Sequence, residues 1–123
     1  MMTPVPFSEL VGKVLVSVEN IDNERLVFTV EDGSVYELTH YQDCCEDVRI
    51  EDITGDFSYL VGSPITMADE SSNSEYENFV SRTWTFYKLA TLKGYVDIRW
   101  LGESNGYYSE RVDFVRTKDA SIA

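Results

Sequence analysis

The sequence predicts a mainly β protein (α+β at most), in which antiparallel sheets form a small sandwich or half-open barrel with one or two short helices. Apolar residues recur with a period of two over several short segments, which is typical of half-buried strands. Asp-Gly, Lys-Gly and Asn-Gly steps separate some of these segments and indicate tight turns. The 123 residues fit one domain, and a hydrophobic content of 43% suffices for a core.

A first strand group is expected within residues 1–42. A helical turn over residues 8–11 ends at Gly12, and a strand follows over about residues 13–19, where every second residue is valine. Residues 25–30 and 35–39 then form a hairpin around Gly33.

The register of this hairpin follows from the apolar pattern. A strict two-residue turn pairs Phe28 with Glu37, whereas a three-residue turn with a bulge at Gly33 places apolar residues opposite each other. We therefore expect the pairs Phe28 with Tyr36 and Leu26 with Leu38. This register also puts His40 on the core face at the end of the sheet.

Residues 43–80 are expected to form an irregular acidic middle, because they show no sustained alternation. The expected elements are a short strand at 48–50, a helical turn over 57–61 between its cap Asp56 and Gly62, a strand at 64–67 and an exposed loop at 71–75.

A second strand group is expected over residues 81–117. Its strands are 82–91, 95–101 and about 107–115, with turns at 93–94 and 104–106. A bulge at Gly106 would pair Ile98 with Val112 and Val96 with Phe114 in a hairpin. We expect a core of Trp84, Phe86, Trp100 and Phe114, and an exposed face with Tyr87, Tyr107, Arg99 and Arg111.

The charge is strongly and unevenly acidic. The chain has 22 acids against 10 bases and a formal net charge of -12, and residues 1–80 alone carry a balance of -14. Such a field repels nucleic acid and anionic lipid. It either simply keeps a small protein soluble or attracts cations or a basic protein surface. The sequence shows no apolar run long enough for a membrane span and no signal-peptide pattern at its start, so we expect a cytoplasmic protein.

Residues 40–46 hold the only histidine and both cysteines. Their residue types suit a metal site or a Cys–His nucleophile. However, adjacent cysteines in extended backbone point to opposite faces, a disulfide between them is strained, and acidic neighbours weaken a thiol nucleophile. The favoured interpretation is structural: the cysteines are small core residues, His40 is hydrogen-bonded and Asp43 caps the turn. We assign no catalytic residue, metal or cofactor.

Phrases along most of the chain, above all His-Tyr-Gln-Asp-Cys-Cys-Glu at 40–46 and Gly-Glu-Ser-Asn-Gly-Tyr-Tyr-Ser at 102–109, carry a family resemblance. The chain resembles a family of small uncharacterised proteins from phages and prophages. This resemblance implies a phage or mobile-element setting and brings no activity with it.

Three functions remain open. The first is a non-catalytic acidic protein that blocks a basic surface of a host protein, for example a defence factor. The second is a small-ligand or nucleotide-binding protein, and the third is a small metal-dependent or Cys/His hydrolase. A homodimer through edge strands is also compatible with the pattern. The candidate partner- or ligand-binding residues are His40, Asp43, Cys44, Glu46, Asp47, Glu51, Asp52, Tyr87, Arg99, Trp100, Glu103, Asn105, Tyr107 and Tyr108.

Overall fold

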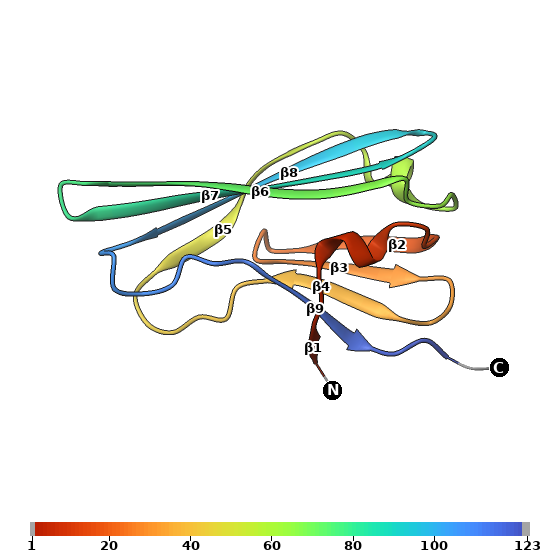
Figure 1. Ribbon diagram of the computed structural model, residues 1–123, viewed down its shortest axis with the longest axis horizontal. Helices are drawn as coiled ribbons and strands as arrows, with labels where there is room; N and C mark the ends of the chain where they lie inside the picture. The colour runs from red at the N-terminus through yellow and green to blue at the C-terminus, as the bar shows by residue number, and fades with distance from the viewer. Residues whose placement is uncertain (1, 122–123) are drawn as a thin grey trace.

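A computed structural model describes residues 2–121, so the first residue of the expected 1–42 group lies outside it. The chain folds into two antiparallel sheets that lie face to face (Figure 1). This confirms the mainly β class and, of the two expected architectures, the sandwich. One sheet has the order β1 (Thr3–Pro4), β9 (Asp113–Lys118), β4 (Val35–Thr39), β3 (Arg25–Val30) and β2 (Leu15–Ile21). The other has the order β5 (Asp47–Thr54), β8 (Gly94–Ser104), β7 (Val80–Thr91) and β6 (Met67–Glu77).

The β3–β4 hairpin has the register that the apolar pattern predicts. Phe28 lies opposite Tyr36, and Leu26 lies opposite Leu38. Gly33 has a φ of 91°, in the left-handed region that glycine tolerates. The strand expected at 13–19 is confirmed with shifted bounds, since β2 runs over Leu15–Ile21.

Both expected helical turns are present as short 3-10 helices. η1 (Phe7–Leu10) precedes Gly12 with its φ of 89°. η2 (Phe57–Leu60) begins after Asp56, whose carboxylate accepts a hydrogen bond from the backbone N–H of Ser58 at 2.8 Å. The cap expected at Asp56 is therefore confirmed.

The acidic middle is more regular than its sequence indicates. The strand expected at 48–50 is the longer β5, and the loop expected at 71–75 is wrong because these residues lie inside β6. β6 is an edge strand of its sheet, and its residues from Asp69 to Glu77 are all exposed. With water on both faces, nothing selects apolar residues at alternate positions, and backbone pairing with β7 alone defines the strand.

The hairpin expected between residues 95–101 and 107–115 is wrong. β8 pairs with β5 and β7, whereas β9 belongs to the other sheet and pairs with β4. Phe114 consequently lies opposite Leu38 and not opposite Val96. Residues 105–112 cross from one sheet to the other.

The two faces of β7 are the reverse of the expected ones. Tyr87 is buried at 1% exposure, whereas Phe86 is 39% exposed and Trp84 is half-buried. Trp100 and Phe114 are buried as expected. The structure therefore corrects the core assignment of Trp84 and Phe86 and the exposure of Tyr87.

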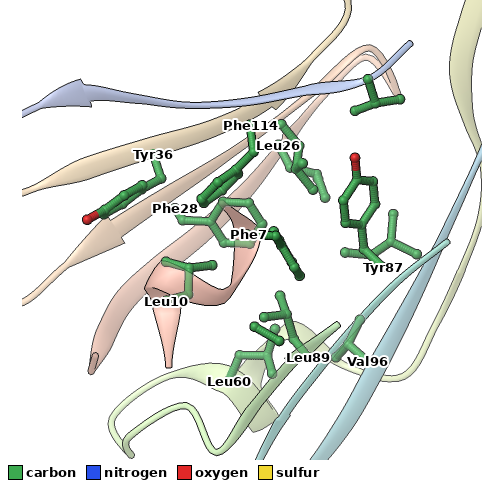
Figure 2. Packing of buried hydrophobic residues seen from close by; sticks show 14 of the residues in the cluster. Phe7, Leu10, Leu26, Phe28, Tyr36, Leu60, Tyr87, Leu89, Val96 and Phe114 are labelled. Carbon is green, nitrogen blue, oxygen red and sulfur yellow. The ribbon is translucent and has the colours of Figure 1, made fainter. Parts of the chain in front are cut away.

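Aromatic rings from both layers meet in the core (Figure 2). Phe114 stacks on Tyr36 with ring centroids 5.4 Å apart and meets Phe7 edge-on at 5.1 Å, and Phe7 in turn contacts Tyr87 at 4.8 Å. The N-terminal turn thus joins the two sheets. Among the described residues, no helix has the length and apolar character that crossing a membrane requires.

Candidate functional site

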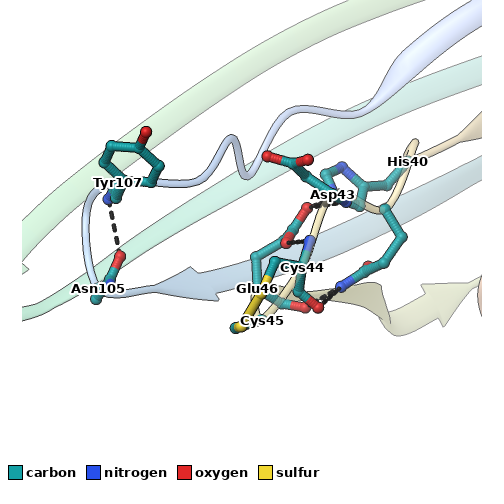
Figure 3. The surroundings of a disulfide bond; sticks show 8 residues. His40, Asp43, Cys44, Cys45, Glu46, Asn105 and Tyr107 are labelled. Carbon is teal, nitrogen blue, oxygen red and sulfur yellow. Dashed lines mark hydrogen bonds and ion pairs between the residues drawn. A yellow bond between two sulfur atoms is a disulfide. The ribbon is translucent and has the colours of Figure 1, made fainter.

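Two connections between the sheets lie side by side at one end of the sandwich (Figure 3). Residues 40–46, here the cysteine loop, lead from β4 to β5. Residues 105–112, here the crossover segment, lead from β8 back to β9. Since β4 pairs with β9 and β5 pairs with β8, the two connections must run next to each other. The two phrases at 40–46 and 102–109 therefore meet in space.

A buried carboxylate holds the cysteine loop in shape. Glu46 is 4% exposed, and its oxygens accept hydrogen bonds from the backbone N–H groups of Asp43 at 2.8 Å and Cys44 at 2.9 Å. These bonds, that from Cys44 foremost, together with His40 lower the pKa of Glu46 to about 2 despite burial. The capping role expected for Asp43 therefore belongs to Glu46.

His40 ties the cysteine loop to the crossover segment. Its Nε2 lies 2.7 Å from Glu46 Oε2, and its Nδ1 lies 2.7 Å from the carbonyl oxygen of Arg111. A carbonyl oxygen and an ionised carboxylate only accept hydrogen bonds. Both bonds form together when both ring nitrogens carry protons, so the geometry fits an imidazolium. The expectation that His40 is hydrogen-bonded is confirmed.

A second buried carboxylate anchors the crossover segment to β7 and β8. Glu110 is 8% exposed and accepts hydrogen bonds from the hydroxyls of Ser81 at 3.2 Å and Thr83 at 2.7 Å, and from Ser104. Gly102 makes room for it: a Cβ at this position would lie 2.7 Å from the Cβ of Glu110. Sequence reasoning missed Glu110, because a lone glutamate inside the strand expected over about 107–115 gives no local signal of burial.

The surface above these anchors is polar and aromatic, and we call it the loop rim. Its members are Asp43, Cys44, Cys45, Asp47, Asn105, Tyr107 and Tyr108. Tyr107 is 82% exposed and meets Tyr108 edge-on at 5.0 Å. Cys45, Asp47, Asn105 and Tyr108 line a shallow hollow of about 350 Å³ together with Glu103.

The structure overturns the expectation that the two cysteines are small core residues. Both are exposed rather than small core residues, and the structure joins Cys44 to Cys45 in a disulfide. The backbone N–H of Cys44 bonds to Glu46, so the pair sits on the capped turn. The two sulfur atoms therefore belong to the exposed loop rim.

Other sequence-predicted residues lie away from the loop rim. Arg99 and Glu51 form an ion pair at 2.9 Å, and Asp52 lies opposite Arg99 on β5. Tyr87 and Trp100, two of the candidate ligand-binding residues, are buried among core residues and do not reach the loop rim. Within residues 2–121, no three His, Cys, Asp or Glu side chains are placed to share a metal ion.

Comparison with known protein families places the chain in a family. A family model described as a domain of unknown function, DUF7448, covers residues 8–114. No curated protein and no solved structure matches the sequence. The matched range includes both the cysteine loop and the crossover segment.

Proposed function

We propose a binding function for this chain, which belongs to the DUF7448 family. In this proposal it is a non-catalytic acidic protein that occupies a basic surface of another protein. One observation carries the proposal: the two connections between the sheets, each fixed by a buried carboxylate, hold exposed acids, the exposed Tyr107 and the half-buried Tyr108 in one rim. A fixed rim loses little conformational freedom on binding.

The chemistry of the rim supports binding more than catalysis. A Cys–His nucleophile needs a free thiolate and an imidazole that accepts its proton. Here the sulfur atoms are joined to each other, and both ring nitrogens of His40 are engaged by Glu46 and Arg111. The histidine and the cysteines of the cysteine loop therefore stabilise the conformation of the loop.

The composition of the rim suits a basic protein partner. Tyrosine is enriched at binding hot spots because it contributes a large rigid area and a polar group. Tyr107 and Tyr108 provide this area, and the exposed Asp43 adds negative charge to the rim. Asp47 pairs with Arg49, and Glu103 pairs with Arg49 and Arg82. The net charge of -12 extends the same sign over the molecule and favours encounter with a cationic surface.

The resemblance to phage and prophage proteins gives this proposal its biological setting. In that setting the protein acts in the cytoplasm of the host cell, and its partner is a host protein such as a defence factor. A partner blocked in this way loses access to whatever anionic ligand its basic surface normally binds.

A charge-matched pull-down tests the proposal. Immobilised wild-type protein is compared in lysate with the double variant Asp43→Lys, Asp47→Lys and with the control Glu19→Lys, Glu31→Lys, which carries the same net charge on exposed positions outside the rim. We expect a basic protein that wild type and control retain, the rim variant loses and moderate salt elutes. Equal retention by all three proteins, or none by wild type, would contradict the proposal.

A further inference from the structure

A polar groove opens beside the loop rim, between the β6–β7 hairpin and the crossover segment. It has a volume of about 430 Å³. Its sheet side is lined by hydroxyl residues of β6 and β7, namely Ser72, Ser81, Thr83 and Thr85. The residues that define it are Glu70, Ser72, Thr83, Thr85, Tyr108 and Glu110.

The groove holds two carboxylates without a counter-charge. Only hydroxyl groups bond to the buried Glu110, and none of the ion pairs within residues 2–121 involves Glu70 or Glu110. Partial burial raises the pKa of Glu70, partly offset by the Tyr87 hydroxyl. Arg111 also borders the groove, but its guanidinium pairs with Asp113 at 3.0 Å.

A buried hydroxyl lies beside one of these carboxylates, that of Glu70. Tyr87 is 1% exposed, and its hydroxyl makes no hydrogen bond of ordinary geometry, although it lies close enough to Glu70 for each group to shift the pKa of the other. Tyr87 stands opposite Glu70 in the β6–β7 register, and Figure 2 shows its hydroxyl pointing away from Leu89 and Val96. Burial, then the charges of Glu70 and Asp113, raise the pKa of Tyr87, so the hydroxyl stays protonated. Unpaired buried polar groups are rare in native proteins.

We propose that this groove receives a cationic side chain of the basic partner, a guanidinium or ammonium group. The inference rests on the proposed function and names the chemistry that the partner inserts. A cation supplies the missing counter-charge, and its N–H groups donate to the carboxylates and hydroxyls of the groove. The same two carboxylates repel phosphate, which makes a nucleotide the wrong occupant.

The free edge of β6 explains how a side chain reaches the groove. β6 pairs with β7 on one side only, so its outer backbone groups are open to an added strand. An extended partner segment along this edge places alternate side chains over the groove. A second copy of β6 would bring its own Glu70, Glu75 and Glu77 against the same residues, and like charges disfavour that pairing.

Titration of the labelled full chain with N-acetylarginine methylamide, followed by amide NMR shifts, tests the groove. We expect saturable shifts at Ser72, Thr83 and Thr85, and none with the neutral isostere N-acetylcitrulline methylamide. The variant Glu70→Gln should weaken binding about fivefold or more, while Glu77→Gln on the same strand changes it less than about twofold. Equal binding of citrulline, or no effect of Glu70→Gln, would overturn the inference.

The test separates this inference from the proposed function. Capture of a basic partner at the loop rim with no arginine shifts in the groove refutes the groove alone. Arginine shifts without a captured partner support the groove and refute the proposed function. Spermidine that binds far more tightly than the arginine derivative would overturn the side-chain assignment in favour of a free amine.

Discussion

Replacement of Gly102 by alanine tests how the crossover segment is held. A Cβ at this position would lie 2.7 Å from the Cβ of Glu110 and 2.9 Å from its carbonyl oxygen. The φ of Gly102 lies outside the left-handed region, so alanine adopts the same backbone without strain. The whole effect is therefore a collision with the crossover segment, which must move by several tenths of an ångström.

The expected size follows from overpacking. An added methyl group in a closed site typically costs about 1–3 kcal/mol. A domain of this length has an unfolding entropy of about 0.26 kcal/mol/K, so the cost corresponds to a fall in Tm of about 4–12 °C. The same movement shifts Glu110 away from its hydroxyl partners Ser81 and Thr83, which adds to the loss.

Calorimetry and urea unfolding of Gly102→Ala provide the measurement. The comparison variant is Gly12→Ala, where a Cβ meets nothing within 4 Å but φ is 89°, so backbone strain alone acts and costs about 1 kcal/mol. A Gly102→Ala protein as stable as wild type would refute the placement of Glu110 against β8.

Three further predictions concern the anchor, the core and the groove. The pKa of Glu46 is about 2 in the folded chain against 4.5 unfolded, so its stabilisation is complete above pH 4.5 and is lost as the pH falls towards 2. Glu46→Gln should lower the urea midpoint at pH 7 and flatten its decline between pH 5 and 2; an unchanged profile contradicts the anchor. Phe114→Ala should lower the free energy of unfolding in urea by about 3–5 kcal/mol. Phe86 is half-exposed on the outer face, so Phe86→Ala should lower it by less than about 1 kcal/mol, and the reverse order would refute the assigned faces. Tyr87→Phe should change the Tm little, because the buried hydroxyl makes no hydrogen bond of ordinary geometry, and should weaken arginine binding; a clear loss of stability would show that its interaction with Glu70 stabilises the fold.

Local patterns in the sequence predicted the N-terminal hairpin and both short helices. The alternation of apolar residues on either side of Gly33 determines the register of the hairpin, because a slip by one residue would expose Phe28 and Leu26. Asp56 and the glycine that ends its helix act within a few residues. Such signals need no knowledge of distant strands.

Choices between distant partners escaped prediction. Phe114 fits the apolar pattern of a pairing with Val96 as well as that with Leu38, and the Asn-Gly step at 105–106 favours the nearer partner. Both faces of β7 carry aromatic residues, so alternation alone cannot tell which face is buried. β6 shows no alternation because neither of its faces is covered.

The candidate site was predicted in its parts and not in its assembly. The phrases at 40–46 and 102–109 stand out as polar and aromatic concentrations, and His40 was expected at the sheet end. That they meet depends on β9 returning to β4, which the sequence does not indicate. The buried role of Glu46 and Glu110 depends on backbone N–H groups and hydroxyls that only the folded chain brings together.

Photo-cross-linking from the loop rim tests the central claim most directly. The photoreactive residue benzoylphenylalanine replaces Tyr107, which is 82% exposed, and a matched protein carries it at the exposed Glu19 on β2. Our account predicts a cross-link from position 107 to a basic protein that disappears in high salt and is absent from position 19. Equal cross-linking from both positions, or a cross-link that high salt leaves intact, would contradict a rim that binds through charge.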